Sequence, residues 1–207
     1  MHILVTDRLA CPRCGPPFGL VLLAEELRDR RVSEGTLGCS NCRERYPVEA
    51  GFGDFRPSPR VPITAPPVTF ADDPEPAMKV AALLGVREGP GLLLVSGDAA
   101  RHAPRVAAMI EGIEVVAVHP GLREVAGSEG VTRLATGDVL PFLTGSLRGV
   151  WIEGEVTETG FREAVRVLGP GARLVAVDPA PGTKERMEDE GLDLLLEAEG
   201  TLVGARK

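Results

Sequence analysis

Four cysteines are the residues of this chain whose type and spacing point most directly to chemistry. They form two Cys-x-x-Cys pairs, Cys11 with Cys14 and Cys39 with Cys42, and 24 residues separate the pairs. A Cys-x-x-Cys turn directs two sulfur atoms toward one point, and two such turns supply the four thiolates that tetrahedral Zn²⁺ prefers. The spacing therefore predicts a structural zinc site formed by all four cysteines.

Two disulfides, a redox motif or four unrelated buried thiols are the alternatives to a metal site. Disulfides belong mainly to secreted proteins, and Asp7 and Arg8 interrupt the short apolar start, so it does not resemble a secretory signal. Redox Cys-x-x-Cys motifs rarely occur as two matched pairs at this spacing. No apolar run is long enough to cross a membrane. We therefore expect a cytoplasmic protein with no membrane partner.

The formal charge of −7 is unevenly distributed along the chain. Residues 1–60 hold nine arginines and eight acidic residues, about +1, which leaves −8 for the remainder. Sequence-independent binding of nucleic acid depends on neutralising phosphates, which an acidic protein does poorly. Nucleic acid is therefore not an expected partner, except through a local basic patch.

Composition divides the chain into three parts. Residues 1–56 contain both cysteine pairs, with strands expected at residues 20–23 and 32–37 and a polar helical turn or insertion at residues 24–31. This module has few apolar residues, so the metal is expected to supply much of its folding free energy, on the order of 10 kcal/mol. Residues 57–76 hold seven prolines and predict a stiff linker to a second domain, residues 77–207.

The second domain alternates between helix and strand patterns. Helices are expected at residues 77–84, 99–111, 161–168 and 183–190, and Val106, Met109 and Ile110 share one face of the second of these. Strands are expected at residues 92–95, 114–118, 131–134, 149–153 and 172–177, followed by a hairpin of residues 192–197 and 201–205. Strands that alternate with helices predict an α/β fold with a doubly wound, mostly parallel sheet.

The first module resembles a small zinc-ribbon family whose members activate methyltransferases or are fused to them. The resemblance covers nearly all of residues 7–57 and includes Leu9-Ala10-Cys11-Pro12-Arg13-Cys14, the second cysteine pair and the following Tyr46-Pro47-Val48. It implies a structural Zn²⁺ and a protein partner.

The second domain resembles the class I S-adenosylmethionine-dependent methyltransferases. Leu140-Pro141-Phe142 followed by Gly145-Ser146-Leu147 is similar to the segment before the fourth strand of that family. Residues 161–175 are similar to the helix, turn and strand that follow, and the terminal hairpin also matches. The resemblance covers roughly residues 77–207 and implies a Rossmann-like methyltransferase fold.

The cofactor loop of that family is not preserved. In the family it reads approximately Asp-x-Gly-x-Gly-x-Gly, and its glycines let the backbone approach the methionine part of the ligand. Here Leu94 occupies the acidic position, Ser96 and Asp98 occupy glycine positions, and Gly97 is out of phase. Asp98 would bring a carboxylate close to that of the ligand, and its simpler role is N-cap of the helix that begins at Ala99.

Two further cofactor contacts are altered or uncertain. His119 stands where the family carries the acid that binds both ribose hydroxyls, and an imidazole offers only one such bond; a loop histidine without a special role is the alternative. Asp138 is the candidate for the acid beside adenine. At about 1.4 kcal/mol per factor of ten, these losses would turn a micromolar site into a millimolar one, so S-adenosylmethionine binding is doubtful.

Acidic side chains also follow the later strands, namely Glu153, Glu155 and Asp178. With Asp98 and Asp138 they would form an acidic crevice suited to a cation or an amine. Polar loops at strand ends are common in such folds, and this is the simpler interpretation.

Three functional hypotheses follow from the sequence. The preferred one is a zinc-binding pseudoenzyme that acts as an adaptor or activator of another protein, such as a methyltransferase, or that self-associates. The second is an active methyltransferase with a divergent loop, acting on RNA or a small molecule, with Glu153 as the base. The third is a crevice that binds a different small ligand.

Overall fold

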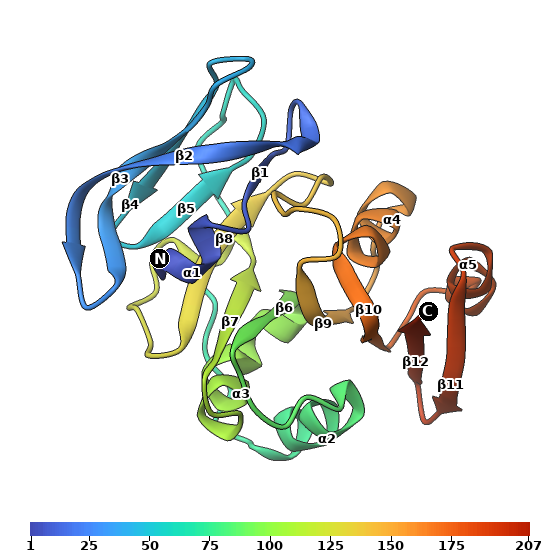
Figure 1. Cartoon of the computed structure of the whole chain (residues 1–207). Helices are drawn as coiled ribbons and strands as arrows, with labels where there is room; N and C mark the ends of the chain where they lie inside the picture. Colours follow the sequence, from blue (N-terminus) through green and yellow to red (C-terminus); the bar gives the residue numbers. More distant parts are fainter.

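A single mixed sheet runs through the whole chain. The computed structural model describes residues 1–207. Its twelve strands lie in the order β1-β2-β3-β4-β5-β8-β7-β6-β9-β10-β12-β11, so the strands of the cysteine-containing module continue directly into those of the second domain (Figure 1). None of the helices has the length and hydrophobicity needed to cross a lipid bilayer.

The elements of the first module are one short helix and five strands. These are α1 (Ile3–Thr6), β1 (Ala10–Cys11), β2 (Gly15–Arg28), β3 (Arg31–Cys39), β4 (Arg45–Glu49) and β5 (Phe52–Phe55). All neighbouring strands among β1 to β5 pair antiparallel. The two long strands β2 and β3 form a hairpin that projects beyond the rest of the module (Figure 1).

The second domain contains seven strands, four α-helices and two short 3₁₀ helices. In chain order they are α2 (Glu75–Leu84), β6 (Gly91–Gly97), η1 (Asp98–His102), α3 (Ala103–Met109), β7 (Ile113–Val118), η2 (Pro120–Leu122), β8 (Val131–Thr136), β9 (Leu147–Glu153), α4 (Glu158–Val167), β10 (Leu168–Val177), α5 (Thr183–Asp189), β11 (Leu192–Ala198) and β12 (Thr201–Arg206). The five strands β8-β7-β6-β9-β10 are parallel, as the alternation of elements predicted. The terminal strands β11 and β12 pair antiparallel with each other, and β12 also pairs antiparallel with β10.

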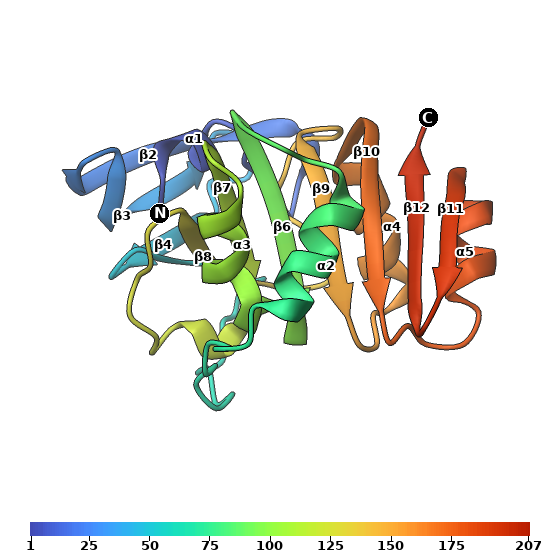
Figure 2. The same ribbon diagram turned by 90° about the horizontal axis from the view of Figure 1, so that it is seen from below.

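Helices α2 and α3 cover one face of this sheet, and α4 and α5 lie on the other (Figure 2). The connections from β7 to β8 and from β8 to β9 contain no α-helix. Parallel strands need cover on both faces, so a second layer is required over β6, β7 and β8. Val5 of α1, Leu37 of β3 and Phe55 of β5 supply it, because they share a core cluster with Val116 and Leu134 of the sheet.

The first module therefore packs into the main core and does not depend on the metal alone for its folding. Its strand β5 pairs parallel with β8 from Phe52 opposite Arg133 to Phe55 opposite Thr136. A polar contact strengthens the junction, because Arg31 at the start of β3 forms a 2.9 Å ion pair with the buried Glu114 of β7. The expectation that the metal supplies much of the folding free energy overlooked this shared core.

The expected helical turn at residues 24–31 is wrong, because β2 continues to Arg28. Asp29 and Arg30 then make a two-residue hairpin turn in which both have positive φ, 46° and 61°. Such a turn matches the twist of the flanking strands. Pairing with β3 has overridden the helix propensity of Ala24-Glu25-Glu26-Leu27.

The single helix expected at residues 99–111 is divided into η1 and α3. The helix α3 carries Pro104 in its first turn, where a proline ring is tolerated because no helical N–H is needed there. Val106 and Ile110 are buried as expected, but Met109 is 38% exposed and does not share their face.

Residues 57–74 form no helix or strand, and they are held against the second domain. The Val68 N–H donates to the Gly121 carbonyl at 3.1 Å, and the Ala71 N–H donates to the Arg101 carbonyl at 2.9 Å. Ile63, Val68 and Phe70 pack against the core cluster that includes α2 and α3.

Candidate metal centre and cofactor crevice

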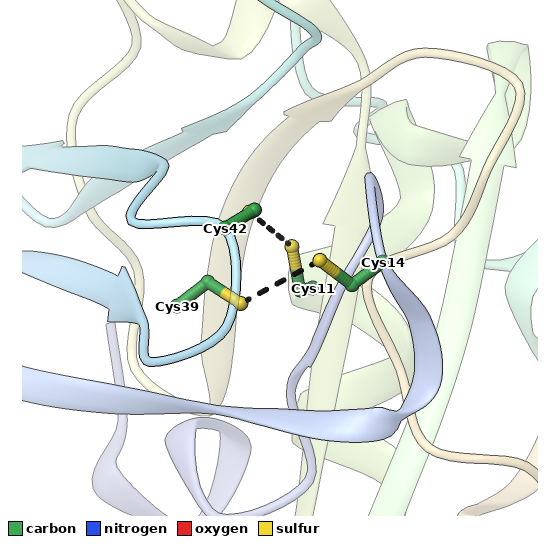
Figure 3. A group of neighbouring side chains, drawn as sticks. All are labelled: Cys11, Cys14, Cys39 and Cys42. Carbon is green, nitrogen blue, oxygen red and sulfur yellow. Dashed lines mark hydrogen bonds between the residues drawn. The ribbon is translucent and has the colours of Figure 1, made fainter.

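The four cysteine sulfurs lie together between two turns of the first module (Figure 3). All four Sγ atoms are within 4.8 Å of one another. Cys11 Sγ lies 3.7 Å from Cys42 Sγ, and Cys39 Sγ lies 3.9 Å from Cys14 Sγ. Each of these short contacts joins one Cys-x-x-Cys turn to the other, so the turns face each other.

Neighbouring polar groups contact two of the sulfurs. The Asn41 side-chain amide donates to Cys14 Sγ at 3.3 Å, and the Tyr46 hydroxyl lies 3.4 Å from Cys11 Sγ. Burial opposes ionisation of Cys39, but backbone N–H groups of Cys42 and Asn41 outweigh it and lower the pKa of Cys39 to about 7. Such donors stabilise a thiolate, the form that binds metals. The pKa of Cys42 moves the other way, to about 12: the Glu44 N–H opposes this rise, and burial and the three neighbouring thiols cause it.

This geometry suits a tetrahedral ion. A Zn–S length of about 2.3 Å places the sulfurs of a tetrahedron about 3.8 Å apart, close to the observed separations. Four sulfur ligands would complete the coordination and leave no position for water or substrate, which is the arrangement of a structural site.

The second candidate site lies where the strand order reverses, at the carboxyl ends of β6 and β9. In open α/β sheets ligands bind in the crevice at this switch point, because the loops from the two strands turn to opposite faces. Here β6 and β9 remain paired as far as Gly97 opposite Glu153. A Cβ atom built on Gly97 would lie 2.6 Å from the Glu153 carbonyl oxygen, so the two backbones are in close contact.

An ion pair bridges this end of the crevice. Arg101 Nη2 in η1 donates to Glu153 Oε1 at 2.6 Å, and Arg101 Nε donates to His102 Nε2 at 3.0 Å. The His102 ring stacks on Trp151 of β9 with centroids 5.2 Å apart. Burial, together with Asp98 and Asp178, raises the pKa of Glu153 although Arg101 opposes the change.

Arg101 and His102 were not among the residues singled out from the sequence. Their positions directly after the cofactor loop could have drawn attention to them. The contact itself could not be foreseen, because it depends on η1 bringing Arg101 across to β9.

Three of the candidate cofactor residues line one cavity of about 210 Å³ beside this ion pair: Ser96, Gly97 and Asp138. Glu153 and Glu155 line it as well. The volume is below the range of roughly 300–1,000 Å³ typical of ligand pockets. Asp138 is engaged by Thr157, whose hydroxyl donates to Asp138 Oδ1 at 3.2 Å.

The other two candidates, Asp98 and His119, do not line this cavity. The predicted N-cap role of Asp98 is wrong, because Gly97 occupies the N-cap position of η1 and Asp98 lies in its first turn without a capping bond. His119 instead caps η2, since its Nδ1 accepts the Gly121 N–H at 3.0 Å. Burial lowers the pKa of His119, which favours the neutral ring.

A larger cavity, of about 350 Å³, lies between the first cysteine turn and the loop after β8. Arg13, Glu44, Pro57 and Val139 contribute to its lining, and it shares Asp138 with the smaller cavity.

Comparisons with solved structures match about two thirds of the chain. A SAM-dependent methyltransferase from Aquifex aeolicus is 18% identical with a TM-score of 0.52, and the match covers 65% of this chain and 90% of that one. Geranyl diphosphate C-methyltransferase from Streptomyces coelicolor A3(2), in complex with Mg²⁺, geranyl diphosphate and S-adenosyl-L-homocysteine, is 14% identical with a TM-score of 0.51 and coverages of 64% and 80%.

A complex between the Haloferax volcanii Trm112 methyltransferase activator and a methyltransferase also matches, with 17% identity, a TM-score of 0.48 and coverages of 62% and 88%. That similarity is too low to support an inference about partners. No protein-family model and no curated protein matches the sequence. The chain therefore has the α/β fold of SAM-dependent methyltransferases, together with a cluster of four cysteines that could bind a metal ion.

Proposed function

We propose that this protein is a zinc-binding, methyltransferase-like pseudoenzyme that acts as an adaptor or activator of another protein. In this proposal residues 1–56 form a zinc-ribbon module, residues 57–76 a linker and residues 77–207 a methyltransferase-like domain with degenerate cofactor motifs. The protein keeps a scaffold whose carboxyl-edge crevice no longer accepts S-adenosylmethionine.

Zn²⁺ would be held by Cys11, Cys14, Cys39 and Cys42 and would stabilise the two turns that carry them. Asn41 and Tyr46 would orient Cys14 and Cys11 through the contacts described above. The ion would supply no catalytic chemistry, because four protein ligands fill its coordination.

The observation that carries the proposal is the ion pair that bridges the crevice at the strand switch point. Gly97 and Glu153 are neighbours in the sheet, and the 2.6 Å pair of Arg101 with Glu153 joins η1 to the end of β9 at this place. A ligand there would have to displace a charged, partly buried pair, and breaking one side of such a pair leaves an uncompensated charge. The remaining space of about 210 Å³ is small for a nucleoside cofactor.

The surroundings of the crevice also disfavour this cofactor. The Nδ1 atom of His119 is already occupied by the Gly121 N–H, so the ring offers one remaining nitrogen to a ribose. Asp98 and Asp178 are close enough to raise the pKa of Glu153, so a carboxylate of a ligand would meet negative charge.

The alternative is an active methyltransferase with a divergent cofactor loop that acts on RNA or a small molecule. One observation favours it: the raised pKa of Glu153 is the kind of shift that suits a general base. In this alternative Glu153 would have to separate from Arg101 before it could accept a proton.

Calorimetric titration of the zinc-loaded protein with S-adenosylmethionine and S-adenosylhomocysteine separates the two functions. We expect no saturable heat up to about 1 mM ligand, which means that the binding free energy is weaker than about −4 kcal/mol. The double variant Arg101→Ala/Glu153→Ala removes the bridging pair, and a gain of binding in it alone would show that the pair closes the crevice.

Saturable micromolar binding to the unmodified protein would overturn the pseudoenzyme and support the methyltransferase. The matched control is His119→Ala, because a cofactor bound in the expected orientation should lose affinity in this variant. If the His119→Ala variant binds the cofactor with unchanged heat and affinity, the cofactor binds outside the crevice at the strand switch point.

A further inference from the structure

Strand β2 exposes a row of large apolar side chains at one end of the sheet. Phe18, Val21, Leu23 and Leu27 are all exposed, with Val21 57% and Leu23 61% accessible. Val21 and Leu23 share a face because side chains alternate along a strand. Leu22 points to the opposite face and packs against the core.

The backbone edge of β2 is also unpaired over this stretch. Strand β1 covers it only as far as Gly19, and the Leu20 N–H then donates to the Leu9 carbonyl at 3.3 Å. Beyond Leu20 no strand pairs with this edge. The backbone groups of successive residues in a strand point alternately to its two sides. Because the Leu20 N–H points away from β3, the N–H and C=O groups of Leu22 and Ala24 point to the same open side.

The opposite end of the sheet is protected in a way that β2 is not. Its edge strand β11 carries Asp193 and Glu197, which form ion pairs with Lys207 at 3.1 Å and with Lys184 at 2.6 Å. Charges on an edge strand discourage pairing with another chain. From Leu20 to Ala24, β2 has no charged residue.

We propose that this edge pairs antiparallel with the same edge of a second copy of the chain about a two-fold axis at Leu22. Leu22 would lie opposite the partner's Leu22 and exchange both backbone hydrogen bonds with it. The Ala24 N–H would donate to the carbonyl of the partner's Leu20, and the same bond would form in reverse. Val21 would lie beside the partner's Leu23, so the exposed apolar side chains of both copies would cover one another.

The sequence on both sides of this segment fits a second copy. Register shifts at Ala24 and Glu26 mark a bulge, which turns the strand aside before it would meet Leu9 of the other copy. Glu25 would then lie near the partner's Arg8, which is exposed and forms no ion pair within its own chain, whereas Glu26 is already paired with Arg28 at 3.2 Å. The acidic end of each strand thus faces a basic residue of the other copy.

The interface would be small, with about five residues of each strand in contact, and we expect a dissociation constant on the order of 10–100 µM. Sedimentation equilibrium of the zinc-loaded protein from about 1 µM to about 1 mM should show a shift from the 21.9 kDa monomer to a dimer. The variant Val21→Lys/Leu23→Lys should weaken the dimer at least about tenfold, since it places charges on the pairing edge.

Leu195→Lys on β11 is the matched control, because Leu195 is 52% exposed on the other edge strand, and it should leave the dimer unchanged. A monomer at all concentrations, or a dimer that the two β2 lysines do not affect, would overturn the proposal.

The register has its own test, which also holds if the lysine variant fails to fold. Val21 and the partner's Leu23 would form a non-hydrogen-bonded pair with Cα atoms about 4.5 Å apart, a separation that a disulfide can span. Mild oxidation of zinc-loaded Val21→Cys/Leu23→Cys should yield a covalent dimer, whereas Leu195→Cys should not. Absence of the covalent dimer would exclude this register, and neither result depends on whether S-adenosylmethionine binds.

Discussion

Each cysteine of the cluster contributes one ligand, so single substitutions test the metal site directly. The unmodified protein should retain one equivalent of zinc after dialysis against a weak chelator, measured by elemental analysis. Cys39→Ser should retain little, because a neutral hydroxyl is a poor substitute for a thiolate whose pKa is lowered to about 7. Asn41→Ala is the control: it removes only the 3.3 Å hydrogen bond to Cys14 and should keep the full equivalent, with affinity lowered by about 10–100-fold. Full retention by Cys39→Ser would contradict a four-cysteine site.

His102 makes stability depend on pH in a defined direction. Burial first, and then the Arg101 guanidinium, lower the pKa of His102 below its usual value. In the unfolded chain His102 is protonated near pH 6.5, whereas in the folded chain it stays neutral to a lower pH. The free energy of unfolding therefore falls as the pH drops below about 6.5. His102→Phe keeps a ring against Trp151 but cannot titrate, so urea unfolding between pH 7 and 5 should show a smaller loss of stability. Equal losses in both proteins would contradict this role.

Among the elements, the junction of β6 and η1 has a conformation that requires glycine. Gly97 has φ 70° and ψ −139°, a region essentially confined to glycine, and its added Cβ would lie 2.6 Å from the Glu153 carbonyl oxygen. Gly97→Ala should therefore lower the free energy of unfolding by about 3 kcal/mol or more. Gly171→Ala is the control, since Gly171 also has positive φ, 72°, but has open space around it. It should cost only about 1–2 kcal/mol, and equal losses in urea denaturation would show that the contact between β6 and β9 adds nothing.

Which elements the sequence predicted depends on whether their pattern is local. The strand predicted at residues 92–95 appears as a short apolar run, because both faces of a parallel strand are covered, and it lies within β6. The strand predicted at residues 114–118 lies within β7. The two cysteine pairs likewise predict their own proximity, because each turn fixes two sulfurs. The segment Ala24–Arg28 was misassigned because cross-strand pairing with β3, a nonlocal contact, decides its conformation.

The candidate cofactor site was only partly predictable for a similar reason. Ser96, Gly97 and Asp138 do meet in one cavity, since strand ends of a parallel sheet lie on the same edge. The capping roles of Gly97 and His119 follow from backbone angles that no residue type specifies alone. The pair of Arg101 with Glu153 joins residues far apart in the chain and emerges only from the folded sheet.

Considered as a whole, the molecule has a core cluster that spans both parts of the chain, where composition suggested two modules joined by a linker. Met1, Leu37, Tyr46 and Phe55 of the first module belong to the same cluster as residues of α4 and α5 in the second. Residues shared by one core usually unfold in one transition. The first module should therefore neither unfold nor release its metal separately from the second domain.

Two reporters at distant places test this cooperativity. Trp151 is the only tryptophan and lies in β9, whereas zinc release, followed with a chromogenic chelator, reports on the cysteine cluster. During urea unfolding of the zinc-loaded protein the two signals should change together. Phe55→Ala removes a fully buried ring that stacks on Tyr46, with ring centroids 5.4 Å apart. It should lower the free energy of unfolding by about 3–5 kcal/mol, as measured equally by both signals.

The matched control for this substitution is Val61→Ala, because Val61 is 69% exposed in the segment between the modules and should move neither transition. If Phe55→Ala released zinc at low urea while the Trp151 signal kept its midpoint, the cysteine module would be an independent folding unit. Coincident shifts instead require that the contacts of β5 with β8 transmit the loss of one side chain to the whole sheet. The first module would then be a structural layer of the methyltransferase-like fold, covering the sheet face that its helix-free connections leave open.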